Sequence, residues 1–222
     1  PPSEELDTTQ WAQHFQPVVQ HPAHRGSVWA KVQERPNTVI LVTLWQTTSA
    51  LRDFLVSPSA QLYWENLAAR GILPIASYEV VYGWEDWFNF LSTSFVQLFS
   101  VYFSAPMTEV QRAQISQLKG IRPPIMGFSI PHRELDQSRL SVQLWATQTE
   151  SRYGQEVQLM LWPHFWQSEK KAEYRNSYTD IIEYGCVVGY RTMIEDFGAK
   201  LEEVGPVKWK EEYCDFKKFR PI

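Results

Sequence analysis

The chain has 222 residues, of which 44% are hydrophobic, so it is long enough to bury one large core or two smaller ones. Its 21 basic and 25 acidic residues give a formal net charge of −4, and no basic stripe runs along it, so we do not expect it to bind nucleic acid. The aromatic share of 14%, with 10 Trp, is high; excess Trp often lines cavities, because its N–H needs a partner.

The remaining composition is typical of a cytosolic globular protein. The two cysteines, Cys186 and Cys214, are too few for a disulfide framework or a zinc site. The polar, acidic segment 1–10 does not resemble a signal peptide. The most apolar stretch, 87–106, is interrupted by Asn, Ser, Thr and Gln and is too polar to span a bilayer. We therefore expect a cytoplasmic protein that does not contact membranes.

The first half of the chain predicts the element order αββαβ. Its expected elements are a helix over residues 10–20, strands over 27–33 and 39–45, a helix capped by Thr48 or Ser49, a helical segment over 60–69 and a strand over 75–82. By comparison with the second half it lacks an opening strand. That strand either preceded Pro1 and was removed, or is a frayed remnant at 1–6.

The second half predicts the complete order βαββαβ. Thr108 and Ser168 are suited to cap helices, and Gly120 and Gly205 to end them. The expected elements are strands over 95–103, 140–147 and 157–166, a helix over 108–118, a long charged helix from Ser168 to Tyr184, a helix over 190–204 and a strand near 209–216.

The two halves match as a repeat in which paired Trp residues bracket a hairpin. Trp29 aligns with Trp145, and Trp45-Gln46 aligns with Trp166-Gln167. The sequence thus predicts an α+β protein of two ferredoxin-like βαββαβ units, residues 1–86 and 87–222.

Alternation along the strands predicts which face binds a ligand. We expect the sheet face that packs on helices to be aliphatic, as Val157, Leu159 and Leu161 are. The other face of that strand carries Met160, Trp162, His164 and Trp166, a mixed aromatic and polar set that is typical of a ligand-facing surface. The four Trp residues of the repeat fall on this mixed face.

His164 is the candidate catalytic residue, because imidazole suits proton transfer near neutral pH. A histidine hydrogen-bonded inside the core explains the position equally well. His132 lies in an apparent insertion, in a loop that is a candidate lid. The candidate substrate-binding residues are Trp29, Thr43, Trp45, Tyr102, His132, Gln143, Trp145, Met160, Trp162 and Trp166.

No cofactor is expected. His21 and His24 are three residues apart, but no third metal ligand lies near them in sequence. The chain has no Gly-rich phosphate loop and no nucleophile–base motif of the common hydrolases. We therefore expect neither metal, heme, flavin nor nucleotide.

Residues 10–83 also carry a family resemblance. His21-Pro22, Gly26-Ser27-Val28-Trp29-Ala30, Gln33-Glu34 with Pro36, Trp45 and Ser49-Ala50-Leu51 resemble the antibiotic biosynthesis monooxygenase family of the dimeric α/β-barrel superfamily, in particular its fungal members. Ala30 and Ala23 stand where that pattern has Gly. The second half resembles the family only at Trp166-Gln167-Ser168.

The resemblance implies sheets that pair into a barrel, usually between two chains. A tandem chain could supply both sheets as a monomer with an internal pseudo-two-fold, or form a homodimer. The family includes cofactor-free oxygenases, and its relatives include polyketide cyclases, heme-degrading enzymes and proteins without known activity. The expected function is a cofactor-independent enzyme of secondary metabolism that cyclises, isomerises or oxygenates an aromatic or polyketide-like small molecule in an aromatic-lined cavity. The alternative is a non-catalytic small-molecule-binding or stress-related barrel protein.

Overall fold

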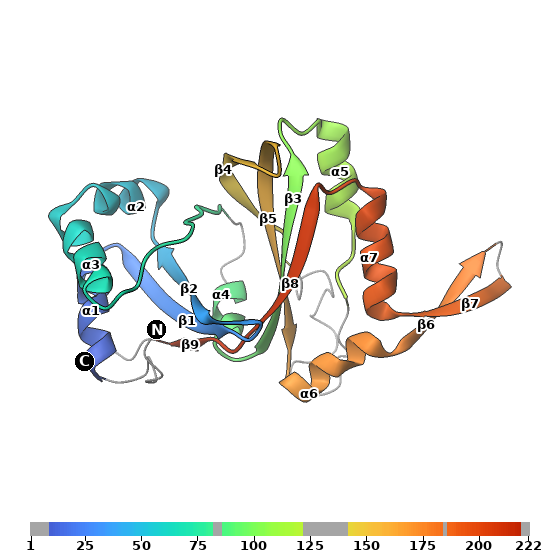
Figure 1. Cartoon of the computed structure of the whole chain (residues 1–222), viewed down its shortest axis with the longest axis horizontal. Coiled ribbons are helices and arrows are strands. Elements are labelled where there is room, and N and C mark those ends of the chain that lie inside the picture. Colours follow the sequence, from blue (N-terminus) through green and yellow to red (C-terminus); the bar gives the residue numbers. More distant parts are fainter. Residues whose placement is uncertain (1–8, 82–85, 122–141, 184–185, 219–222) are drawn as a thin grey trace. The chain divides into compact units, whose positions relative to one another are not determined.

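A computed structural model shows an α+β fold with antiparallel strands (Figure 1). It describes residues 9–81, 86–121, 142–183 and 186–218. The chain divides into two compact units, residues 1–77 with 215–222, and residues 78–214. The expected boundary, between 86 and 87, differs from this division, because residues near the C-terminus belong to the first unit.

The first unit combines three helices with a small antiparallel sheet in the described residues. Its elements are α1 (Thr9–Val19), β1 (His24–Val32), β2 (Arg35–Trp45), α2 (Thr48–Leu55), α3 (Pro58–Ala68) and β9 (Lys217–Lys218). β1 pairs antiparallel with β2 and with β9. Thr47 and Ser57 cap α2 and α3 by accepting backbone N–H groups, and Pro58 opens α3 where its missing N–H costs nothing.

The second unit contains most of the strands. Its elements are α4 (Asp86–Leu91), β3 (Phe95–Ser104), α5 (Glu109–Gln117), β4 (Leu144–Arg152), β5 (Gln155–Trp166), α6 (Glu169–Ala172), the 3₁₀ turn η2 (Glu173–Asn176), β6 (Tyr178–Glu183), β7 (Cys186–Thr192), α7 (Met193–Glu203) and β8 (Lys208–Cys214). Within this unit the strand order is β8-β3-β5-β4, and each neighbouring pair is antiparallel. β3, α5, β4, β5, α7 and β8 come in the succession predicted for this half, but α6, η2, β6 and β7 are inserted between β5 and α7.

Capping side chains set where the helices of the second unit begin. Thr108 forms a capping box with Gln111, and Thr192 forms one with Glu195. Ser168 caps α6 by accepting from the Lys171 N–H. The sequence-based prediction that Thr108 and Ser168 are N-caps is confirmed.

The long charged helix predicted from Ser168 to Tyr184 is wrong. Only α6 and η2 form there, and β6 and β7 then pair as a separate two-stranded sheet, which Figure 1 shows in orange. The helix predicted over 190–204 begins instead at Met193. The segments YTDIIE and CVVGYRT are rich in β-branched and aromatic residues, and this preference outweighs the helical charge pattern before them.

The strand predicted over 75–82 is also absent from the described part of that segment. Leu73 and Ile75 are 73% and 76% exposed. Within the second unit, Val80 forms an isolated bridge to Ala146, and the Glu79 carbonyl accepts the Thr147 N–H at 2.8 Å, but no continuous strand forms over the described part of 75–82. In the described residues the third strand of the first unit is β9, and the last strand of the predicted αββαβ order, over 75–82, is not observed.

No helix in the part of the chain that the structure describes is long and apolar enough to cross a membrane.

Candidate functional site

Helices cover the aromatic face of the sheet in the second unit. Met160, Trp162 and Trp166 of β5 pack in one core with Ile115 of α5 and Phe197 of α7. The aliphatic residues of the same strand, Val157 and Leu159, lie in another cluster with Tyr102 and Ala146. The alternation along β5 is as predicted, but the expectation that only the aliphatic face packs on helices is wrong: the mixed face meets α5 and α7, while on the other face Phe165 meets Phe90 of α4 with ring centres 5.7 Å apart.

The first unit shows the same reversal. Trp29 is buried with Phe54 of α2 and Tyr63 of α3, and the partly buried Trp45 packs against this cluster. Large rings bury much apolar area, so they fill the space between sheet and helices as well as aliphatic side chains do. The expectation that a helix-packed face must be aliphatic was too narrow.

Four polar side chains, which we call the polar row, lie within the helix-covered face of the second unit. They are His164 of β5, Gln97 of β3, and Glu211 and Tyr213 of β8. Gln97 stands opposite His164 on one side and opposite Tyr213 on the other. His164 and Gln97 are completely buried, Tyr213 is 9% exposed and the Glu211 side chain is 22% exposed. Polar groups at such depth are stable only when they are hydrogen-bonded.

Gln97 forms hydrogen bonds both to the buried Trp166 and to the Glu211 carboxylate. Its Oε1 accepts a hydrogen bond from Trp166 Nε1 at 2.9 Å. Its Nε2 donates to Glu211 Oε1, also at 2.9 Å. Both ends of the amide are therefore used, and the Trp166 N–H has the partner that a buried indole requires.

Glu211 also receives donors from the surface side. The Tyr213 hydroxyl donates to the same Oε1. Arg175 of η2 places Nε 3.7 Å from this oxygen and its guanidinium 4.6 Å from the centre of the Tyr213 ring. The connected network runs from the partly buried Arg175 through Glu211 and Gln97 to the buried Trp166. Arg175 balances the charge of the Glu211 carboxylate.

His164 is held in the core through both ring nitrogens. Nε2 accepts the backbone N–H of Ile121 at 3.0 Å, and Nδ1 lies 3.2 Å from the carbonyl oxygen of Trp162. A carbonyl can only accept, so Nδ1 carries the proton. Phe99 and Phe197 meet the imidazole edge-on, with ring centres at 5.0 and 5.5 Å.

The surroundings of His164 keep it neutral. Burial lowers its pKa to about 3, against the opposing effect of the hydrogen bond to Trp162. To take a proton from a ligand, the ring would first have to release Ile121. This geometry favours the core histidine of the two sequence-based interpretations, and the catalytic role stays a prediction.

Most other predicted site residues of the second unit lie on the same helix-covered face. Met160 and Trp162 are completely or almost completely buried. Gln143 Nε2 donates to the Ile115 carbonyl at 2.9 Å, and the Trp145 ring lies 4.7 Å from the Arg112 guanidinium. Tyr102 is on the opposite face, in register with Leu159. His132 lies outside the described residues.

The remaining predicted residues belong to the first unit. Trp45 donates its Nε1–H to Thr43 at 2.9 Å, and its ring contacts Phe54 and His21, with centres 4.9 and 5.2 Å apart. Trp29 is buried in the same cluster. These residues are therefore packing partners of the helices of the first unit, and their predicted role as ligand contacts stays untested.

Sequence reasoning missed Gln97, Glu211, Tyr213 and Arg175. A signal existed for the first, because Gln97 is an amide in the middle of the apolar strand FVQLFSVYFS. Glu211 and Glu212 likewise interrupt a strand that ends in buried residues. Pairing these positions, however, requires the register of β3 against β8, which the sequence does not specify.

Nothing in the described residues forms a metal site. No group of three or more His, Cys, Asp or Glu side chains there could hold a metal ion. That no cofactor is needed stays a prediction.

Comparison with known proteins adds no relative: no family model, no curated protein and no solved structure matches this chain. The resemblance to the antibiotic biosynthesis monooxygenase family therefore stays an expectation.

Proposed function

We propose that this protein is a cofactor-independent enzyme that transfers protons on an aromatic or polyketide-like small molecule, with Glu211 as the base. One observation carries the proposal. The donors to this carboxylate among the described residues, from Gln97, Tyr213 and Arg175, all converge on Oε1. Among the described residues Oε2 has no such partner, so the carboxylate is fixed through one oxygen while the other can accept a proton.

The depth of Glu211 supports this role. Its side chain is 22% exposed, and it lies between the buried Gln97 and Arg175, whose side chain is 27% exposed. A base at this boundary can meet a small molecule while the protein, rather than water, holds it in place. Hydroxyl and carbonyl groups of polyketide-like molecules acidify neighbouring C–H and O–H bonds, which makes such molecules suitable partners for a carboxylate base.

The chemistry balances without a redox partner. A substrate C–H bond breaks, its proton passes to Oε2 of Glu211, and the electron pair forms an enolate. Return of the proton at another carbon isomerises the substrate. Attack of the enolate carbon on a carbonyl of the same molecule cyclises it instead: the new C–C bond forms as the carbonyl π bond breaks, and the resulting alkoxide takes the proton from Oε2 of Glu211. The positive charge of Arg175 is available for the enolate oxygen. In this scheme His164 is a positioning residue that fixes Trp162 and Ile121.

Hydrogen exchange tests this function without knowledge of the natural substrate. Phenolic and β-dicarbonyl polyketides would be incubated with the protein in D₂O, with and without oxygen, and followed by NMR and mass spectrometry. We expect catalysed exchange that Glu211→Gln lowers on the order of 10² or more, the usual contribution of a positioned base.

Glu202→Gln is the matched control. Like Glu211, which accepts the Tyr213 hydroxyl, Glu202 accepts a hydrogen bond from an aromatic side chain, the Trp209 Nε1–H at 2.6 Å, but it lies outside the polar row. The control should leave exchange unchanged. Equal exchange in wild type and Glu211→Gln would contradict the proposal. Product that gains oxygen only in air would favour oxygenation, and saturable binding without exchange would favour the non-catalytic alternative.

A further inference from the structure

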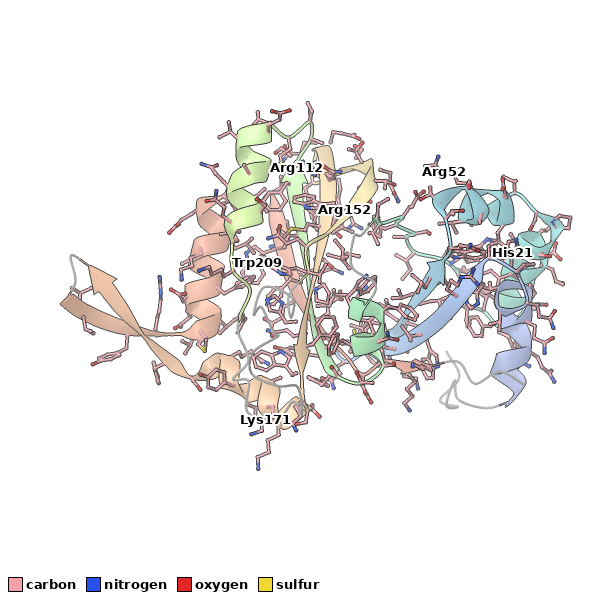
Figure 2. The ribbon with its side chains drawn as sticks, turned by 180° about the vertical axis from the view of Figure 1, so that it is seen from behind. His21, Arg52, Arg112, Arg152, Lys171 and Trp209 are labelled. Atoms are coloured by element: carbon pink, nitrogen blue, oxygen red, sulfur yellow. The ribbon has the colours of Figure 1, made fainter. Side chains whose placement is uncertain are left out.

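The hairpin between β4 and β5 ends in a cluster of aromatic and charged side chains. Arg152 closes β4 and pairs with Gln155 across the turn Tyr153-Gly154. Tyr102 of β3, Glu150 of β4 and Tyr78 complete the cluster. Its strand residues lie on the face opposite the polar row, because Glu150 and Tyr102 pair with Val157 and Leu159 of β5. Figure 2 labels Arg152 at this hairpin.

The backbone of the turn is unusual at Tyr153. Tyr153 and Gly154 have φ of 55° and 78°, so both central residues of the two-residue turn are left-handed. Asn-Gly and Asp-Gly are the ordinary choices for such a turn. A bulky residue in this conformation is an outlier, and strained positions concentrate at functional sites. The left-handed backbone at Tyr153 therefore suggests that its ring has a role other than forming the turn.

The ring of Tyr153 forms one wall around Arg152. The Arg152 guanidinium lies 5.0 Å from the centre of the Tyr102 ring and 5.8 Å from that of Tyr153. The two rings meet edge-on with centres 5.4 Å apart. Tyr102 is buried, whereas Tyr153 is 50% exposed. A cation is thus held against two aromatic rings, one of which faces solvent.

In the part of the chain that the structure describes, only one nitrogen of the Arg152 guanidinium has a protein partner. Arg152 Nη1 donates to the Tyr102 hydroxyl and lies 3.7 Å from Glu150 Oε1. That carboxylate oxygen accepts the Tyr78 hydroxyl at 2.9 Å. Among the described residues, Nε and Nη2 have no hydrogen-bond acceptor. These two nitrogens form the planar fork that binds a carboxylate through two parallel hydrogen bonds.

The tyrosines remain proton donors at neutral pH. Burial raises the pKa of Tyr102, against the opposing charge of Arg152. Burial, followed by the hydrogen bond to Glu150, raises the pKa of Tyr78. Because the Tyr102 oxygen accepts from Arg152, its own proton can be donated.

We propose that Arg152, Tyr153 and Tyr102 form a binding site for a small monocarboxylate with a flat apolar body. The carboxylate binds the Nε–Nη2 fork, and the body lies on the exposed ring of Tyr153. Glu150 sets the charge of the ligand, because a second negative charge so close to Arg152 repels dianions. This inference goes beyond the proposed function, since it concerns the opposite face of the sheet and different residues.

Benzoate is the probe, with benzamide as its uncharged counterpart and inorganic phosphate as the dianionic one. Binding to the full chain would be followed by NMR titration. We expect saturable binding of benzoate only, with affinity lowered at least about tenfold in Arg152→Gln, which removes the charged fork. The matched control is Arg112→Gln: Arg112 also stacks on an aromatic ring, of Trp145, but donates to Gln158 at 2.8 Å on the helix-covered face.

Tyr153→Asn separates binding from folding. Asn-Gly is the favoured sequence for this turn, so the variant should keep or raise the melting temperature. If the ring serves the ligand, benzoate binding weakens several-fold in the same variant. Unchanged benzoate binding in Arg152→Gln or Tyr153→Asn would overturn the proposal. So would equal binding of benzamide, or a Tyr153→Asn melting temperature lowered enough to make the ring structural.

Discussion

Both units cover an aromatic sheet face with helices, yet the two faces differ in their polar groups. In the first unit, Trp45 is partly exposed and donates to Thr43, two residues earlier in its own strand. In the second unit, the matching Trp166 is completely buried and donates to Gln97 of another strand. The predicted repeat has Trp at both positions. Only the second-unit indole donates to a side chain, Gln97, that connects it to further polar groups. Equivalent positions in a repeat thus share packing rather than chemistry.

The largest expected difference between the units is in the matched Trp residues themselves. Trp166→Ala should lower the free energy of unfolding by about 3–5 kcal/mol, because it leaves a large cavity in a closed core. Trp45→Ala should cost less, since part of that ring already contacts water. Chemical denaturation of both variants measures this, and equal losses would show that the two positions are equivalent after all.

Gln97→Met tests the bond that distinguishes the second unit. The variant keeps the volume but leaves the buried Trp166 N–H without its acceptor, which should cost about 1–3 kcal/mol of unfolding free energy. Denaturation of Gln97→Met, Trp166→Phe and the double variant would isolate the pair. No coupling between the two substitutions would mean that the bond does not stabilise the core.

His164 should make stability depend on pH. Burial lowers its pKa from 6.5 to about 3, so the unfolded chain binds a proton that the folded protein does not. Stability from this group is complete above pH 6.5 and falls by about 1.4 kcal/mol per pH unit as the pH drops from 6.5 towards 3. His164→Gln should lower the free energy of unfolding by about 1–2 kcal/mol at pH 7, because the backbone hydrogen bonds of the imidazole are lost. It should also make the free energy of unfolding depend less on pH between 6.5 and 3.

The same variant addresses the predicted catalytic role. If His164 acts as the acid or base, turnover in the exchange assay should fall by about 10² to 10⁴ while the fold is retained. A variant that melts lower but turns over normally would assign the residue to the core.

The smallest expected effect is at the first-unit counterpart of Gln97. Thr43→Val removes the acceptor of the Trp45 N–H, but water can replace it at this partly exposed position. We expect a change of less than about 0.5 kcal/mol in unfolding free energy. A loss as large as that of Gln97→Met would mean that the two units use their Trp residues in the same way.

The features that could be predicted from the sequence are those set by residues close together in the chain. The strand that contains His164, and the helix caps Thr108 and Ser168, follow from alternation and from side-chain oxygens at the right spacing. Which face of β5 meets helices could not be decided the same way, because large rings and aliphatic chains bury equally well. The hairpin of β6 and β7 was not predicted, because the charged residues after Ser168 favoured a helix that continued to Tyr184.

Most of the polar row could not be predicted from the sequence. Gln97 and Glu211 are far apart in sequence, and their contact depends on how β3 and β8 align. His164 was found because imidazole is conspicuous in an apolar strand. Its two backbone partners, Ile121 and Trp162, became visible only in the folded protein.

The short strand β9 gives the chain a nested order of assembly. Lys217 and Lys218 pair with Trp29 and Val28 of β1, and the Lys217 ammonium lies 5.8 Å from the centre of the Trp29 ring. The whole second unit is therefore an excursion between two pieces of the first. During synthesis β9 cannot pair with β1 until residues 78–214 have left the ribosome, so the first unit is incomplete until then. A stalled or shortened chain would leave Val28 and Trp29 on that edge of β1 without their β9 partners, where another strand could pair with them.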